Sequence, residues 1–146
     1  MSTTTLAWRQ NRGLIIAEDD VDDQLLIRDA LEENGVLAGD VLFVDDGQEL
    51  MDRLKAPDLV PGLILLDLNM PRMDGREALR QIKQDDTLKH IPIVVFTTSS
   101  SVQDVKNTYQ LGGNTFFTKP TSFDELVRVM SLIKSYWLET ALLAKD

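Results

Sequence analysis

Residues 63–75 read Leu-Ile-Leu-Leu-Asp-Leu-Asn-Met-Pro-Arg-Met-Asp-Gly, and this stretch decides the fold. Its first four residues form an apolar run that predicts a strand buried on both faces, as strands of parallel sheets are. The run ends at Asp67, and open α/β sheets bind their ligands at the carboxyl ends of strands. Pro71 disfavours helix at the residue before it, so the loop stays extended until Asp74, which can cap a helix that begins at Gly75. An ordinary turn residue would explain Asp67 equally well, so its role depends on the other strands.

After a leader of residues 1–12, the chain alternates between short apolar runs and segments with helical spacing. The runs that predict strands are 14–17, 41–44, 63–66, 93–96 and 115–118. The segments that predict helices are 21–34, 48–55, 75–84, 102–110 and 122–138. This alternation predicts an α/β fold, in which five parallel strands form one sheet with helices on both faces.

Length and composition indicate one globular domain. The chain has 146 residues, of which 43% are hydrophobic, and this is enough to bury a core. We divide it into a flexible leader (1–12), a domain (13–140) and a tail (141–146), which leaves no room for a DNA-binding module after residue 140. The absence of cysteine fits the cytoplasm. The net charge of −9 argues against a nucleic-acid partner, and no apolar run is long enough to cross a membrane.

Polar side chains follow four of the predicted strands. Glu18 and Asp19 follow the first strand, Asp67 the third, Thr97 the fourth and Lys119 the fifth. Because right-handed crossovers bring the carboxyl ends of parallel strands to one edge, we expect these side chains to lie together. Three carboxylates at one point repel one another unless their pKa values rise or a cation binds. Oxygen ligands without histidine or cysteine favour Mg²⁺.

The same side chains suit phosphoryl transfer. A carboxylate such as Asp67 can act as a covalent nucleophile. Lys119 can bind a phosphoryl oxygen as a point charge, and Thr97 can donate a hydrogen bond to another. Each residue also has a simpler explanation: residues 18–20 could place acids at a helix N-terminus, and Lys119 could be a solvated strand end. Their coincidence at one edge of the sheet favours the phosphoryl-transfer site.

The motifs at these strand ends resemble those of response-regulator receiver domains in two-component signalling. In chain order they read Ile-Ile-Ala-Glu-Asp-Asp, Leu-Leu-Asp-Leu-Asn-Met-Pro-Arg-Met-Asp-Gly, Val-Val-Phe-Thr-Thr-Ser and Phe-Phe-Thr-Lys-Pro, and the resemblance covers residues 13–140. It implies a flavodoxin-like, doubly wound sheet with strand order 2-1-3-4-5 and five helices. It also implies a signalling protein rather than an enzyme, with chemistry limited to the Mg²⁺-dependent gain and loss of phosphate.

The resemblance implies a role for each acidic residue of the site. Asp67 would accept a phosphoryl group from the phosphohistidine of a sensor histidine kinase. Asp19 would bind Mg²⁺ directly and Glu18 through water. Asp67 and the backbone carbonyl of Asn69 would complete the set of protein ligands.

The remaining site residues would contact the phosphoryl group or respond to its presence. By resemblance, Thr97 would donate a hydrogen bond to it and Lys119 would pair with it. Phe116 occupies the position of the switch aromatic, where many family members have tyrosine, so a hydroxyl-mediated part of the switch is missing here. The peptide between Lys119 and Pro120 is typically cis in this family.

A finer resemblance is to the small, stand-alone response regulators of bacterial phytochromes. It rests on Lys89-His90-Ile91-Pro92, on the run Thr97-Thr98-Ser99 and on Tyr136-Trp137-Leu138-Glu139. This resemblance implies a phytochrome-type kinase as the partner.

Two other classes of protein compete with the receiver. The first is a Mg²⁺-dependent phosphatase or phosphotransferase that acts on a small molecule. Such an enzyme needs a second acid two residues after the nucleophile, and Asn69 occupies that place and cannot protonate a leaving group. The second is a scaffold that is never phosphorylated, which the complete set of site residues disfavours.

The last predicted helix carries more apolar surface than packing against a sheet requires. Its apolar residues are Phe123, Leu126, Val127, Val129, Met130, Leu132, Ile133, Tyr136, Trp137 and Leu138. On a helical wheel Leu132 falls well outside the main stripe, and the other residues span about 200°, compared with the stripe of about 100° that a surface helix needs. The excess predicts a two-fold homodimer through this helix. Alternatively, Leu6 and Trp8 of the leader fold back and cover it within the monomer.

Overall fold

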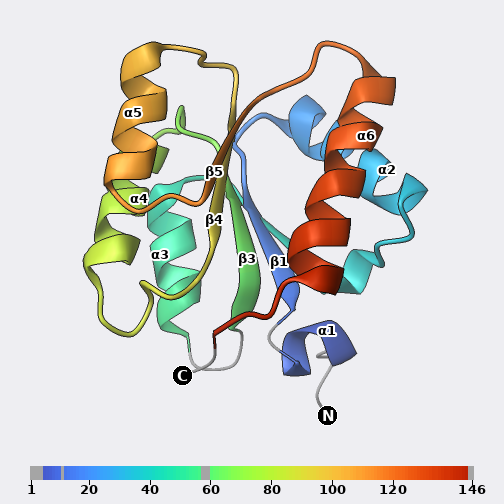
Figure 1. Cartoon of the computed structure of the whole chain (residues 1–146), viewed down its shortest axis with the longest axis horizontal. Helices are drawn as coiled ribbons and strands as arrows, with labels where there is room; N and C mark the ends of the chain where they lie inside the picture. Colours follow the sequence, from blue (N-terminus) through green and yellow to red (C-terminus); the bar gives the residue numbers. More distant parts are fainter. Residues whose placement is uncertain (1–4, 11, 57–59, 145–146) are drawn as a thin grey trace.

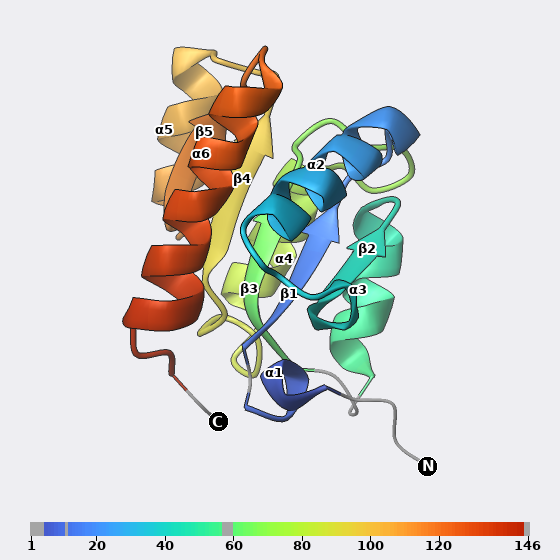
Figure 2. The same ribbon diagram turned by 90° about the vertical axis from the view of Figure 1, so that its right-hand side faces the viewer.

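The computed structural model describes residues 5–10, 12–56 and 60–144. Five strands form one parallel sheet in the order β2-β1-β3-β4-β5, which confirms the predicted topology (Figure 2). The strands are β1 (Gly13–Ala17), β2 (Val41–Val44), β3 (Pro61–Leu66), β4 (Ile93–Thr97) and β5 (Thr115–Thr118). All four pairings are parallel, so the carboxyl ends of the strands meet at one edge, as the site requires.

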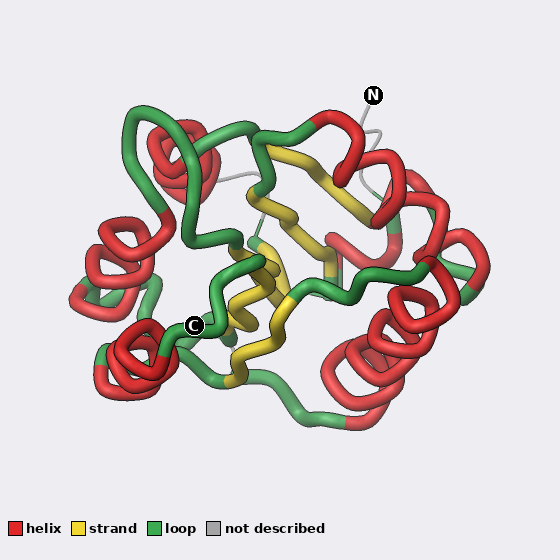
Figure 3. Tube along the Cα trace, turned by 90° about the horizontal axis from the view of Figure 1, so that it is seen from above, coloured by secondary structure: helices red, strands yellow, loops and turns green. Residues whose placement is uncertain are grey.

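Helices cover both faces of this sheet (Figure 3). The described α-helices are α1 (Leu6–Arg9), α2 (Val21–Glu33), α3 (Gly47–Lys55), α4 (Gly75–Gln84), α5 (Val102–Gln110) and α6 (Phe123–Ile133), and all but α1 cover the faces. One face carries α3, α4 and α5 (Figure 1). The other carries α2 and α6, which pack side by side (Figure 2). The bounds of α2, α3, α4 and α5 agree with the prediction within one residue, and α6 begins one residue after its predicted start.

Five helices begin at a capping side chain. The caps are Asp20, Asp46, Asp74, Ser101 and Ser122, and each accepts a hydrogen bond from the backbone N–H three residues further on. A cap satisfies one of the N–H groups that have no partner in the first helical turn. Each cap follows a strand, so the caps fix where each helix leaves the carboxyl edge of the sheet and thereby set the loops that carry the site.

The core has two layers because side chains alternate along the strands. Ile15 and Ile64 point toward α3 and α4, and they share a buried cluster with Leu50 and Leu79. The residues before them, Leu14 and Leu63, point the other way. They join a second buried cluster with residues of α2 and α6, such as Ile27 and Met130. Both faces of β1 and β3 are therefore buried, as the continuous apolar runs predicted.

The leader differs from its prediction where the structure describes it. Residues 6–9 form α1 beneath the amino ends of the strands, and only 7% of Trp8 is exposed (Figure 1). Its indole Nε1 donates to the carbonyl of Gly39 at 2.8 Å, and its ring lies so close to Gly13 that a Cβ there would be 2.2 Å away. The burial of a large aromatic ring offsets the entropy lost on ordering the segment, which explains why it does not fray.

The last helix also differs from its prediction. Instead of one helix to residue 138, α6 ends at Ile133 and continues as a wider π-helical segment from Lys134 to Thr140. The Arg12 guanidinium donates to the carbonyls of Leu138 and Ala141 at 2.9 and 3.1 Å, so it satisfies two groups at the end of this segment. Trp8 belongs to the core cluster on the α3 and α4 face, so it does not cover the apolar surface of the last helix.

Candidate functional site

The site lies where four strands end, and Lys119 is at its centre. The Lys119 ammonium forms ion pairs with the carboxylates of Glu18, Asp23 and Asp67, at 2.9 Å from Asp23 Oδ2 and 3.0 Å from Asp67 Oδ2. Two backbone hydrogen bonds extend the sheet into the site, from Asp67 N to the carbonyl of Ala17 and from Lys119 N to that of Thr97. The structure therefore brings the residues after β3 and β5 together with those after β1, as predicted.

Three carboxylates could hold a cation. Oxygen atoms of Glu18, Asp19 and Asp67 lie within 4.8 Å of one another. Glu18 and Asp67 are buried, whereas Asp19 is exposed. Burial raises the pKa of Glu18 to about 7, against the opposing effect of its contact with Lys119. A full set of ionised carboxylates is thus unfavourable here without added positive charge, and oxygen donors of this kind fit a hard divalent cation.

Lys119 stays positively charged in this setting. Burial alone would lower the pKa of its ammonium group, but hydrogen bonds to Glu18, Asp23 and Asp67 outweigh burial and raise the pKa above its usual value. The lysine can therefore serve as a permanent cation at the site.

The loop after β3 holds Asp67 by close backbone packing. Asp67 Oδ1 accepts the N–H of Asn69 at 3.1 Å, while Oδ2 faces Lys119. Gly75 N donates to the carbonyl of Leu68 at 2.9 Å, and a Cβ on Gly75 would lie 2.1 Å from the Asp67 carbonyl oxygen. Only glycine permits such a close approach, so the start of α4 is pressed against the loop that carries the carboxylate.

Thr97 ends β4 and Phe116 lies in β5, and one expectation nearby is corrected. Thr97 is fully buried, and its Oγ lies 3.5 Å from the side-chain nitrogen of Asn69. Phe116 is half-buried against the cluster under α3 and α4, and its backbone N–H donates to the Tyr109 hydroxyl at 3.2 Å. The expected cis peptide before Pro120 is wrong, since the structure describes no cis peptide bond in residues 5–10, 12–56 or 60–144 and trans is the intrinsically preferred form.

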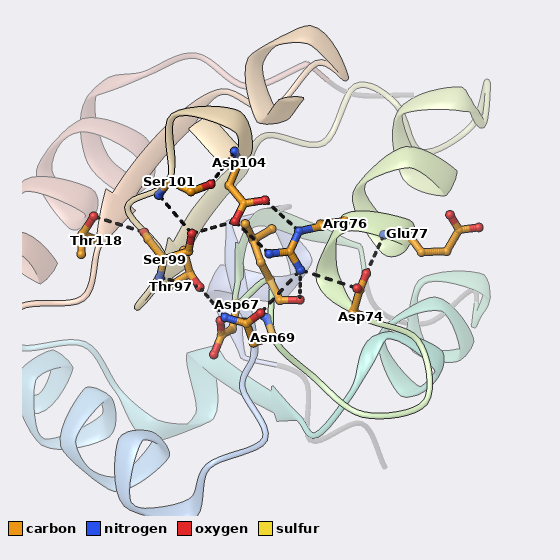
Figure 4. Close-up of polar contacts among 11 residues, drawn as sticks. Asp67, Asn69, Asp74, Arg76, Glu77, Thr97, Ser99, Ser101, Asp104 and Thr118 are labelled. Atoms are coloured by element: carbon orange, nitrogen blue, oxygen red, sulfur yellow. Dashed lines mark hydrogen bonds and ion pairs between the residues drawn. The ribbon is translucent and has the colours of Figure 1, made fainter. Parts of the chain in front are cut away.

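Sequence reasoning missed two features of the site. Asp23 contacts Lys119 from the first turn of α2, where acids are common for the helix dipole alone. The second is an ion pair between Arg76 and Asp104, which links the first turns of α4 and α5 (Figure 4). Asp23 could have been found from its place one turn after the acidic strand end. The ion pair joins positions 28 residues apart and has no local signal.

A parallel sheet in this order, with an acidic site and a lysine at its carboxyl edge, defines a class of phosphate-signalling domain. The family model described as "Response regulator receiver domain" matches residues 14–131. The chain therefore belongs to the receiver domain family of two-component signalling. No helix of the described residues is long and apolar enough to span a membrane.

Several named proteins resemble the chain over most of its length. It is 37% identical over 135 residues to the response regulator Rcp1 of Synechocystis sp., covering 89% of this chain and 91% of Rcp1. It is also 37% identical over 129 residues to the "Probable methanogenesis regulatory protein FilR2" of Methanothrix harundinacea, covering 86% of this chain and 83% of FilR2.

Solved structures of related proteins have the same fold as this chain. The phosphorylated cyanobacterial phytochrome response regulator RcpA superposes with a TM-score of 0.83 at 38% identity, covering 92% of this chain and 99% of RcpA. The Mn²⁺-bound form of Rcp1 superposes with a TM-score of 0.81 at 35% identity, with the same coverage. These relatives confirm the predicted resemblance to phytochrome response regulators.

Proposed function

We propose that Asp67 accepts a phosphoryl group from the phosphohistidine of a sensor histidine kinase. The observation that carries this proposal is the position of its carboxylate between the Lys119 ammonium and the Asn69 N–H, beside Glu18 and Asp19. In the transfer, an Asp67 oxygen forms a bond to phosphorus while the P–N bond of phosphohistidine breaks, and the imidazole nitrogen keeps the electron pair.

Lys119 and Thr97 would hold the phosphoryl oxygens. The ammonium of Lys119 already lies 3.0 Å from Asp67 Oδ2, so it can offset the charge that arrives there. Thr97 ends the neighbouring strand, and its hydroxyl lies next to the loop that carries Asp67 (Figure 4). Loss of the phosphate to water at the same carboxylate is the only turnover that we ascribe to the chain.

Glu18, Asp19, Asp67 and the backbone carbonyl of Asn69 would hold Mg²⁺. The three carboxylates lie close enough to share one ion, and hard oxygen donors suit Mg²⁺. The existence of a Mn²⁺-bound form of the relative Rcp1 supports a divalent cation. When bound, the ion supplies positive charge to the phosphoryl oxygens.

Phosphorylation would switch the protein through Thr97 and Phe116. A phosphoryl group adds negative charge beside Thr97 and Lys119 and would draw the Thr97 hydroxyl toward it. Phe116, which is half-buried next to this strand, could then fill the space that Thr97 leaves. We expect beryllofluoride, a mimic of the acyl phosphate, to shift the NMR resonances of Thr97, Thr98 and Phe116. Shifts limited to neighbours of Asp67 in sequence would contradict the switch.

The partners follow from the relatives and from the surface. Because RcpA is a phytochrome response regulator, a phytochrome-type kinase is the proposed phosphate donor. The absence of cysteine supports the cytoplasm as the proposed location. Such a kinase should transfer phosphate faster than an unrelated one, and equal rates would contradict this pairing.

The last helix would form a homodimer, since Leu132 and Tyr136 remain 48% and 59% exposed. The net charge of −9 is unsuited to nucleic acid.

Labelling with acetyl phosphate and Mg²⁺ tests the acceptor. The intact mass of the parent should rise by one phosphoryl group, and that of Asp67→Asn should not change. Asp29→Asn is the matched control, because Asp29 is an exposed aspartate of α2 that lies outside the described site. Full labelling of Asp67→Asn would show that the acceptor is another residue.

A further inference from the structure

A closed ring of polar contacts connects the loop after β3 to the loop after β4 (Figure 4). Arg76 donates to Asp104 through Nε and Nη2, both at 2.8 Å, and the Ser99 hydroxyl donates to Asp104 at 2.6 Å. Arg76 Nη1 donates to the side-chain oxygen of Asn69 at 3.5 Å. The ring closes on Thr97, whose Oγ accepts from Asn69 Nδ2 and from the backbone N–H of Ser99, both at 3.5 Å.

The contacts of the ring differ in strength. The two-pronged contact between Arg76 and Asp104 is charge-assisted, and only 14% of the Asp104 side chain is exposed. The hydrogen bonds from Arg76 and Ser99 hold the pKa of Asp104 at about 2, so this carboxylate stays charged. The two contacts with Thr97 and the contact between Arg76 and Asn69, all at 3.5 Å, are long and weak. The ring is therefore held strongly at the ion pair and only weakly at Thr97.

The donors and acceptors of the ring have complementary orientations. A guanidinium can only donate, so Asn69 must turn its oxygen to Arg76 and its N–H groups to Thr97. An ionised carboxylate can only accept, so the Ser99 hydroxyl must donate to Asp104. Thr97 Oγ therefore faces two donors and uses its two lone pairs on them, which leaves its own hydrogen for a further acceptor.

We propose that Arg76 and Asp104 are positioning residues that keep the Thr97 hydroxyl ready to donate to a phosphoryl group on Asp67. This inference rests on the proposed function of Asp67 and adds to it two residues that do not touch the acceptor carboxylate. A donor that is oriented in advance needs no reorganisation when the charge arrives. Opening the ring should slow phosphorylation even though Asp67, Lys119 and the metal ligands are unchanged.

Two variants open the ring from opposite sides. Arg76→Lys keeps the positive charge but loses the guanidinium group, which donates two hydrogen bonds to Asp104 and a third to Asn69. Asp104→Ala removes the carboxylate, and it provides a second opening of the ring if one variant folds poorly. Matched controls come from α4 itself, where Arg80 grips Glu77 in an exposed pair of the same kind. Arg80→Lys and Glu77→Ala should therefore leave the site as it is.

The experiment measures the rate of labelling by acetyl phosphate, the affinity for beryllofluoride in Mg²⁺ and the melting temperature of each variant. Arg76→Lys and Asp104→Ala should each label about tenfold more slowly than the parent, the scale expected for a supporting partner of a site residue. The double variant should be no slower than either single variant, because the ring is already open. The amide resonance of Ser99, which faces Thr97, should move in Arg76→Lys and stay in Arg80→Lys.

Labelling of Arg76→Lys and Asp104→Ala at the parent rate would overturn the positioning role, whatever their melting temperatures. Equal slowing in the Arg80→Lys and Glu77→Ala controls would also overturn it, because the effect would then be a general one on α4. A parent that takes no phosphate at Asp67 would instead overturn the proposed function itself.

Discussion

Lys119 contacts three carboxylates at once, so most of the charge balance of the site depends on one ammonium group. Even so, the pKa of Glu18 remains raised to about 7 because burial opposes its ionisation. One lysine is therefore not enough to stabilise all the acids of the site. A bound cation is the simplest source of the missing positive charge.

Removal of one carboxylate tests this balance. Asp19→Ala should weaken Mg²⁺ binding by about tenfold or more and stop phosphorylation, because the exposed carboxylate of the metal site is lost. Without metal, the variant should be at least as stable as the parent, since one source of repulsion is gone. Thermal unfolding with and without Mg²⁺ measures both effects, and Asp22→Ala, an exposed aspartate in the first turn of α2, is the control. Parent-like phosphorylation in EDTA would show that the metal has no part in the reaction.

At the scale of elements, the leader contributes through a single side chain. Trp8 is buried in the main core cluster, whereas Leu6 of the same helix is 60% exposed. Trp8→Ala should lower the free energy of unfolding by about 3 kcal/mol, the usual effect of truncating a buried aromatic residue. Leu6→Ala should change it little. Urea denaturation compares the two, and an equal, small effect of both would mean that α1 does not pack in solution as described.

The ion pair between α4 and α5 predicts a pH dependence. The pKa of Asp104 falls from 3.8 to about 2, mainly because Arg76 donates to it. A carboxylate with a depressed folded-state pKa contributes stability that is present above its unfolded value and lost as the pH falls toward the folded value. Between pH 5 and pH 2, the free energy of unfolding of the parent should therefore fall by about 1 kcal/mol more than that of Asp104→Asn. This is the size of effect expected for a partly exposed ion pair. Parallel acid-unfolding curves for both proteins would contradict this contribution.

At the scale of the whole molecule, the last helix leaves apolar surface on one side. Tyr136 and Trp137 stack edge to face at 5.0 Å, and Leu132 and Tyr136 are exposed nearby. Aromatic residues of this kind suit the core of an interface. Tyr136→Glu should convert the proposed dimer to a monomer in sedimentation experiments, whereas Val102→Glu, at an 84% exposed site on α5, should not. A parent that sediments as a monomer at high micromolar concentration, with or without phosphate, would rule out the dimer.

The sequence predicted the fold and the centre of the site for one physical reason. In a parallel sheet, residues that follow different strands share one edge, so the positions of Asp67 and Lys119 followed from the strand pattern alone. Features built by tertiary contacts were not predictable. Trp8 is buried only because Gly13 leaves room for its ring, and Arg76 meets Asp104 only once α4 and α5 are in place. The π-helical end of the last helix likewise forms against Arg12, which is distant in sequence.

Chemical mapping of the label shows whether Asp67 carries the phosphate. The protein is phosphorylated with acetyl phosphate and Mg²⁺, the acyl phosphate is reduced with borohydride, and peptides are sequenced by mass spectrometry. Because borohydride reduces an aspartyl phosphate to homoserine, we expect homoserine at position 67 and unmodified aspartate at positions 19 and 23. Homoserine at another acidic position, with position 67 unmodified, would contradict it.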